Sequence, residues 1–131
     1  MNILAVDTAG KTAGVALLQD DRLLYEVYLD GGMTHSETLM PMIDTCLKMC
    51  GLTCADIDLY AVNAGPGSFT GLRIGLAAVK GLALLRETPC APVSPLEELA
   101  AAHTGEGTVL CALEARPAQV SSAALYFASH P

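Results

Sequence analysis

The sequence predicts an α/β fold in which helices pack on a mixed, five-stranded sheet. Short apolar runs typical of strands come first, and after residue 30 they alternate with longer stretches of helical periodicity. The order strand–strand–strand–helix–strand–helix–strand, followed by a further helix and strands, is typical of a mixed sheet covered by helices. The absence of an internal repeat fits a single α/β unit.

The first three strands are expected at residues 3–6, 13–18 and 23–29. The turn at residues 8–11 joins the first two, and the polar residues 19–22 form a hairpin turn before the third. Three strands joined by such short turns predict an antiparallel meander.

The first long helix is expected over about residues 34–50. Thr34 or Ser36 serves as its N-cap and Glu37 lies in its first turn. Pro41 falls inside the pattern, which predicts either a late start or a kink. Several apolar residues repeat at helical spacing and form one stripe: Leu39, Ile43, Cys46, Leu47 and Cys50.

A fourth strand at residues 57–62 leads into the turn Gly65-Pro66-Gly67, and a second long helix follows from Thr70 to about Arg86. Glycine allows a sharp turn and a close approach, and the free N–H groups of a helix start attract anions. Two interpretations of the turn stay open: an anion-binding cradle, or only a tight connection between strand and helix.

The second helix carries small residues on one face, where Gly71, Gly75 and Ala78 align with Leu82. Each glycine weakens a helix by about 1 kcal/mol relative to alanine, so a close contact should offset the loss. That contact lies either within the domain or between chains, and we favour a contact between chains. The cations Arg73 and Lys80 share one face, where they either bind a partner or remain solvated.

The remaining pattern predicts a fifth strand at residues 91–93 and a helix from Ser94 to about His103. Further strands are expected at residues 108–113 and 120–127. A first domain over residues 1–113 and the remnant or start of a second at 114–131 follow from this division together with the resemblance described below.

The composition limits the kinds of partner. The 131 residues carry 7 Lys and Arg against 14 Asp and Glu, a net charge of −7, which argues against autonomous binding of nucleic acid. No apolar run reaches the ~18 residues of a membrane helix and no basic leader opens the chain, so we expect a cytoplasmic protein without membrane contact. Five cysteines, an odd number, argue against a disulfide framework. For Cys46, Cys50 and Cys54 we favour buried or semi-buried thiols over a metal site.

Asp7 and Thr8 follow the first strand and are candidates for a nucleotide site. A carboxylate there can hold a metal-bound water, and Thr8-Ala9-Gly10 resembles the hairpin that cradles phosphate in actin-like ATPases. A simple capped turn is the alternative. The candidate cofactor-binding set, which we regard as vestigial, is Asp7, Thr8, Gly65, Gly67 and Ser68.

Three segments together resemble the TsaB (YeaZ) family: Ile3-Leu4-Ala5-Val6-Asp7-Thr8, then His35-Ser36-Glu37 with Leu39 and Pro41, and the long stretch from Gly65 to Gly75. The resemblance covers residues 1 to about 113. It implies an actin/Hsp70-like ATPase (ribonuclease H-like) fold, with a second domain that begins near residue 114.

The resemblance implies a non-catalytic subunit of tRNA threonylcarbamoyladenosine synthesis. Its partners would be a TsaD-type transferase and a TsaE-type ATPase, with tRNA contacted only indirectly and a homodimer formed when the chain is alone. TsaD has two metal-binding histidines where this chain has Pro95 and Leu99, so we expect no metal and no catalytic residue. We expect no cofactor of its own, and weak binding of ATP and magnesium shared with partners stays open.

The resemblance and the small-residue face together place the expected partner interface on the two long helices. Its residues are His35, Leu39, Met42, Ile43, Gly71, Leu72, Gly75, Leu76 and Val79. The competing function is an actin-like ATP-binding enzyme that uses Asp7, Thr8 and the glycine turn. A protease is a third and weaker possibility.

Overall fold

The computed structural model describes residues 1–30, 35–94, 107–116 and 119–127. A five-stranded sheet has the order β3-β2-β1-β4-β5, with β1 antiparallel to β2 and parallel to β4. The expected meander and mixed sheet are therefore confirmed. The strands are β1 (Asn2–Asp7), β2 (Ala13–Gln19), β3 (Arg22–Leu29), β4 (Leu59–Asn63) and β5 (Cys90–Val93).

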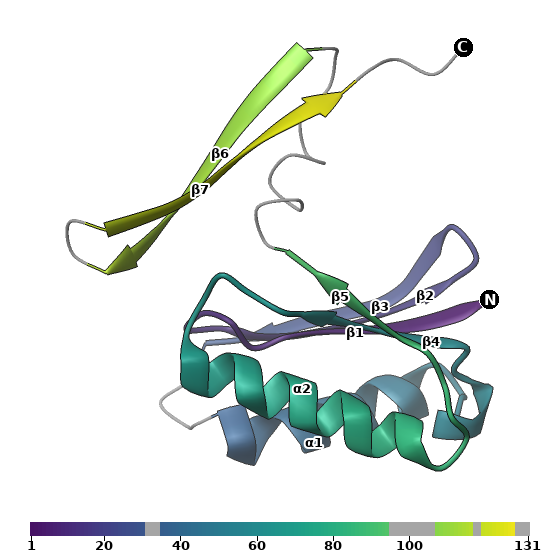
Figure 1. The fold of residues 1–131 in the computed structure, drawn as a ribbon. Helices are drawn as coiled ribbons and strands as arrows, with labels where there is room; N and C mark the ends of the chain where they lie inside the picture. The colour runs from purple at the N-terminus through teal and green to yellow at the C-terminus, as the bar shows by residue number, and fades with distance from the viewer. Residues whose placement is uncertain (31–34, 95–106, 117–118, 128–131) are drawn as a thin grey trace.

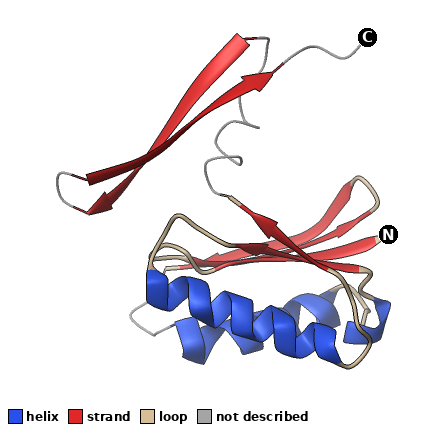
Figure 2. Cartoon of the chain, in the orientation of Figure 1, coloured by secondary structure: helices blue, strands red, loops and turns tan. Residues whose placement is uncertain are grey.

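Two helices, α1 (His35–Met49) and α2 (Phe69–Leu84), lie side by side on the same face of this sheet (Figures 1 and 2). The hydrophobic core fills the layer between the sheet and the two helices, because alternate strand residues point toward the helices. Its most deeply buried side chains are Leu4, Leu17, Leu39, Ile43, Cys46, Tyr60 and Val79. Within the described residues, no helix is both long and apolar enough to cross a membrane.

Helix α1 begins at His35 and continues through Pro41. The expected late start is therefore wrong, and Ser36 lies inside the helix rather than at its N-cap; Thr34 lies outside the described residues. The other end is set by Gly51, whose φ of +68° suits glycine, while the N–H of Leu52 donates to the carbonyl of Leu47 at 2.9 Å. The helix thus ends before Cys54, which belongs to a short 3₁₀ turn, η1 (Cys54–Asp56).

Helix α2 begins after Ser68, whose hydroxyl accepts a hydrogen bond from the N–H of Gly71 at 3.3 Å. This is an ordinary N-cap and satisfies one of the free donors of the first turn. The helix ends at Leu84, two residues before the expected end at Arg86. It connects the parallel strands β4 and β5, as a crossover helix must.

A separate antiparallel hairpin consists of β6 (Gly107–Arg116) and β7 (Gln119–Phe127). Both strands were expected, although β6 is longer at each end than the pattern suggested. The expected domain boundary at residue 113 falls inside β6, and the division into domains remains a prediction. Most of the helix expected from Ser94 to about His103 lies outside the described residues.

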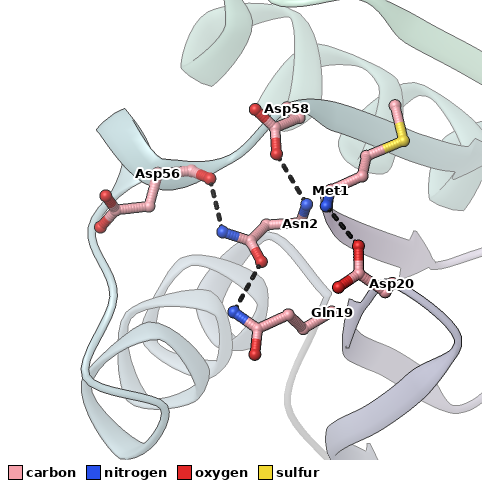
Figure 3. Close-up of polar contacts among 6 residues, drawn as sticks. All are labelled: Met1, Asn2, Gln19, Asp20, Asp56 and Asp58. Atoms are coloured by element: carbon pink, nitrogen blue, oxygen red, sulfur yellow. Dashed lines mark hydrogen bonds and ion pairs between the residues drawn. The ribbon is translucent and has the colours of Figure 1, made fainter.

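The amino end of β1 is attached to its neighbours by exposed polar contacts (Figure 3). The N–H of Asn2 donates to Asp58 at 2.7 Å, and the Asn2 side chain donates to the carbonyl of Asp56 at 2.9 Å. The terminal ammonium of Met1 forms an ion pair with Asp20 at 2.6 Å. These contacts fix the start of β1 beside the start of β4.

Candidate functional site

The carboxyl ends of β1 and β4 meet because the two strands are parallel neighbours, with Val6 opposite Val62. The following residues, Asp7 and Asn63, therefore lie together. The Asn63 amide donates to Asp7 Oδ1 at 3.1 Å, and the N–H of Ala9 donates to the same oxygen at 3.0 Å. Asn63 is 4% exposed, so this contact is shielded from water.

The Gly65-Pro66-Gly67 turn packs directly on the turn that follows β1. The N–H of Gly65, at φ +98°, donates to the Asn63 side chain at 3.0 Å. A Cβ on Gly67 would lie 2.7 Å from the Cβ of Ala9, closer than real Cβ atoms approach. The N–H of Ser68 also donates to the Ala9 carbonyl at 2.8 Å. The two turns therefore touch, backbone against backbone.

Thr8 connects the same turn to α2. Its hydroxyl, on a residue 2% exposed, donates to the carbonyl of Gly71 at 2.6 Å. A Cβ on Gly71 would lie 2.0 Å from the Thr8 carbonyl oxygen, and one on Gly75 would lie 2.5 Å from Thr8 Oγ1. The close approach that these glycines permit is thus to β1 of the same chain. This corrects the interpretation of Gly71 and Gly75 as a contact between chains.

His35 brings the first residue of α1 into the same cluster. Its Nε2 donates to the carbonyl of Gly10 at 2.6 Å. Hydrogen bonds therefore hold together the start of α1, the turn after β1 and the start of α2, at the carboxyl ends of β1 and β4.

The structure brings together all five residues expected to bind a cofactor: Asp7, Thr8, Gly65, Gly67 and Ser68. Four of the neighbouring backbone N–H groups, those of Ala9, Gly65, Ser68 and Gly71, donate within the chain. Within the described residues, no group of three His, Cys, Asp or Glu side chains could hold a metal ion.

Asn63 is the residue that sequence reasoning left out of this site. It is the last residue of the apolar strand β4, and Ala64 alone separates it from the glycine turn. Its side chain therefore lies at the carboxyl end of a parallel strand. This position in the sequence could have identified Asn63 as a site residue.

The nine residues expected at a partner interface fall into two groups, one buried in the chain and one that reaches solvent. Leu39, Ile43 and Val79 are at most 1% exposed and Met42 is 8% exposed, so these side chains fill the core. With Gly71 and Gly75 packed on Thr8, three of the nine reach solvent: His35, Leu72 and Leu76. Any interface on these helices must use their outer surface.

The outer surface of α2 carries an exposed stripe of apolar and basic residues, which we call the α2 stripe: Phe69, Arg73, Leu76, Lys80 and Leu84. Phe69 is 73% exposed and Leu84 is 76% exposed. The Arg73 guanidinium lies 5.4 Å from the centre of the Phe69 ring, within range of a cation–π contact. Exposed apolar residues repeated along one helix face mark a candidate contact surface.

The cysteines with described side chains, Cys46, Cys50, Cys54 and Cys90, are all free, in agreement with the expected thiols. Burial, reinforced by the neighbouring Cys50, raises the pKa of the Cys46 thiol to about 12. Burial also raises the pKa of Tyr60 to about 12, and the neighbouring Cys54 and Cys90 add to the rise. Both groups stay neutral at physiological pH, so neither supplies a nucleophile.

Comparison with known proteins shows which family this chain resembles in sequence. Residues 31–127 match the family model of TsaD, described as tRNA N6-adenosine threonylcarbamoyltransferase. The tRNA threonylcarbamoyladenosine biosynthesis protein TsaB of Bacillus subtilis is 38% identical over 121 residues, which are 92% of this chain and 53% of that protein. The chain spans about half the length of the curated relatives it matches.

Solved structures agree with the sequence relatives. YeaZ from Pseudomonas aeruginosa superposes with a TM-score of 0.83 at 32% identity, over 97% of this chain and 61% of that one. Two more distant structures share the fold alone: RuvC of Thermus thermophilus, with a TM-score of 0.53, and an actin-like ATPase-fold protein of Bacteroides thetaiotaomicron, with a TM-score of 0.52. The expected actin-like, ribonuclease H-like fold is confirmed.

Proposed function

The chain belongs to the TsaB (YeaZ) family, and on that premise we propose that it is a non-catalytic subunit of tRNA threonylcarbamoyladenosine synthesis that binds a TsaD-type transferase. The α2 stripe carries this proposal. It offers three exposed apolar side chains with two cations on a helix whose inner face is fixed against β1. A rigid helix with apolar anchors and a polar rim suits a protein partner.

The charge balance supports a role without direct tRNA contact. The chain has a net charge of −7, and Arg73 and Lys80 on the α2 stripe are two of its seven Lys and Arg residues. Neutralising phosphates needs several clustered cations. We therefore propose that the partner holds the tRNA and performs the transfer.

The first test measures binding to the TsaD-type protein of the same organism. Leu76→Asp places a charge at the centre of the α2 stripe and should weaken binding at least about tenfold, equivalent to about 1.4 kcal/mol. Met49→Asp is the matched control, since Met49 is a 70% exposed apolar residue at the end of α1 and belongs neither to the α2 stripe nor to β3. Equal affinities for both variants would reject the α2 stripe as the contact surface.

A transferase assay separates support from mere binding. Adding the wild-type chain to the TsaD-type protein, with tRNA and the activated threonylcarbamoyl donor, should raise the rate of modification. The Leu76→Asp variant should need a higher concentration to reach the same rate. Activity of the chain without the transferase would contradict a non-catalytic role.

We extend the proposal to assembly. A TsaE-type ATPase joins the complex in the cytoplasm, and without its partners the chain forms a homodimer through the α2 stripe. Sedimentation of the wild type and of Leu76→Asp tests the homodimer, because only the variant should remain monomeric at concentrations where the wild type associates.

The competing function, ATP binding at Asp7 and Thr8, is less well supported. The N–H groups of Ala9, Ser68 and Gly71 donate within the chain, so a phosphate that used these three donors would have to displace existing hydrogen bonds. We expect no binding of ATP and magnesium in the micromolar range by calorimetry. Micromolar binding that is lost in Asp7→Asn would favour the nucleotide-binding alternative.

A further inference from the structure

Strand β3 is a long open edge of the five-stranded sheet. It has eight residues, Arg22–Leu29, and in the part of the chain that is described it pairs only with β2. The opposite edge, β5, has four residues and contains Pro92, which has no N–H to donate. An edge strand presents a row of backbone donors and acceptors that another strand can use. The two edges therefore differ, and β3 is the one suited to accept a further strand.

An apolar groove runs beside this edge, between β3 and α1. Tyr25, Val27 and Leu29 form its strand side, and Pro41 with Met42 form part of its helix side, around a volume of about 320 Å³. The three strand residues alternate along β3, so they share the side that faces α1. A strand added next to β3 would direct every second side chain into this groove.

The charges around the groove favour a basic occupant. Glu37 is the acidic residue that lines it, and among the described residues no Lys or Arg does. Asp30, which follows the strand, is exposed, and the whole chain has a net charge of −7. An acidic segment would therefore be repelled, whereas Lys or Arg could pair with Glu37 at the apolar surface.

We propose that β3 and this groove bind an extended segment of a partner protein by β-strand addition. The segment has apolar side chains at alternate positions and a Lys or Arg opposite Glu37. Backbone hydrogen bonds to β3 supply affinity, and the groove and Glu37 select the sequence. This surface lies on the sheet edge and is independent of the α2 stripe.

A labelled peptide of sequence Lys-Thr-Val-Thr-Val-Thr-Lys, blocked at both ends, is the probe, because its Lys and Val side chains share one face. Fluorescence anisotropy measures its binding. The matched peptide with Glu at both ends should bind at least about tenfold more weakly. Two N-methylated versions, each blocking the amides on one edge, test strand addition. One version should lose binding and the other keep it, because only one edge of the peptide faces β3.

Glu37→Lys reverses the charge of the groove and should reverse the preference between the two peptides. Asp44→Lys is the matched control, because Asp44 is also an exposed acid of α1 but does not line the groove. This control should retain the preference for the basic peptide. Circular dichroism confirms that both variants are folded.

Amide hydrogen exchange locates the bound peptide. Exchange of alternate β3 amides should slow on binding, while β5 amides should be unaffected. Absence of binding at millimolar peptide, protection on α2 instead of β3, or loss of binding with both N-methylated peptides would overturn the proposal. Protection of β3 in the protein alone, together with a dimer in sedimentation, would assign the edge to a second copy and overturn the assignment to a partner.

Discussion

The two ends of β1 are both joined to neighbouring segments by side-chain hydrogen bonds, yet they differ in burial. At the amino end, Met1 and Asp20 form an ion pair whose side chains are 58% and 78% exposed (Figure 3). At the carboxyl end, Thr8 is 2% exposed and its hydroxyl donates to the Gly71 carbonyl of α2 at 2.6 Å. Exposed ion pairs contribute little, whereas buried polar groups are costly to disturb. The carboxyl end should therefore dominate both stability and the position of α2.

The largest effect is expected from Gly71→Ala. The new Cβ would lie 2.0 Å from the Thr8 carbonyl oxygen, a backbone atom that cannot move without shifting β1 or α2. We expect a loss of about 3 kcal/mol in the free energy of unfolding, measured by urea denaturation.

Gly81→Ala is the matched control in the same helix, since nothing lies within 4 Å of its added Cβ. Alanine favours the helix, so this variant should be more stable by about 0.5–1 kcal/mol. If both variants were equally stable, the close contact between α2 and β1 would be disproved.

Asn63→Asp should have the next largest effect. It places a second carboxylate 3.1 Å from Asp7 Oδ1 in place of an amide donor. We expect a loss of about 2 kcal/mol at pH 7, from the lost hydrogen bond and the repulsion between like charges. The loss should shrink at acid pH, because protonation of either carboxyl group restores a donor. Urea denaturation at pH 7 and pH 4 measures this, and an effect independent of pH would argue against the direct contact.

Thr8→Val should have an intermediate effect. Valine keeps the shape of the side chain but removes the hydroxyl that donates to the Gly71 carbonyl at 2.6 Å. The expected loss is about 1 kcal/mol. Thr70→Val, at an exposed position of α2, should be nearly neutral. Calorimetry measures the melting temperatures of the two variants. Equal shifts from the wild type would mean that the hydrogen bond of the Thr8 hydroxyl does not contribute to stability.

The smallest effect is expected at the amino end, from Asp20→Asn. The hydrogen bond and charge of Asp20 raise the pKa of the Met1 amine above its usual value near 8. This contribution to stability is therefore complete below about pH 8 and is lost as the pH rises through the folded-state pKa. Asparagine tolerates the positive φ of 54° at this position.

The measurement for Asp20→Asn is the difference in melting temperature from the wild type at pH 7 and at pH 10. A small difference at pH 7 should disappear at pH 10. Asp21→Asn, a neighbouring exposed acid, should show no such dependence. If Asp20→Asn lowered the melting temperature more than Thr8→Val does, the amino end of β1 would contribute more to stability than the carboxyl end, contrary to our expectation.

Most of the fold could be predicted, because strands and helices leave local signals. The meander, the two long helices and their approximate bounds follow from apolar periodicity and turn residues. Pro41 indicated either a late start or a kink, and the helix begins at His35, which excludes the late start. A proline within a helix loses one hydrogen bond, and packing of Leu39, Ile43 and Cys46 in the core can offset that loss.

The sequence by itself determined the strands, the helices, the glycine turn and the family resemblance, because each depends on residues close together in the chain. Only the tertiary structure decided what the glycines of α2 face. Thr8 and Gly71 are 63 positions apart, and helical periodicity identifies a face without identifying its neighbour. The same limit applied to Leu39, Ile43 and Val79, which were expected at an interface and lie in the core. The hydrophobic effect favours burial of an apolar side chain equally against its own sheet and against another chain. Only the folded structure could therefore show which surface covers these three residues.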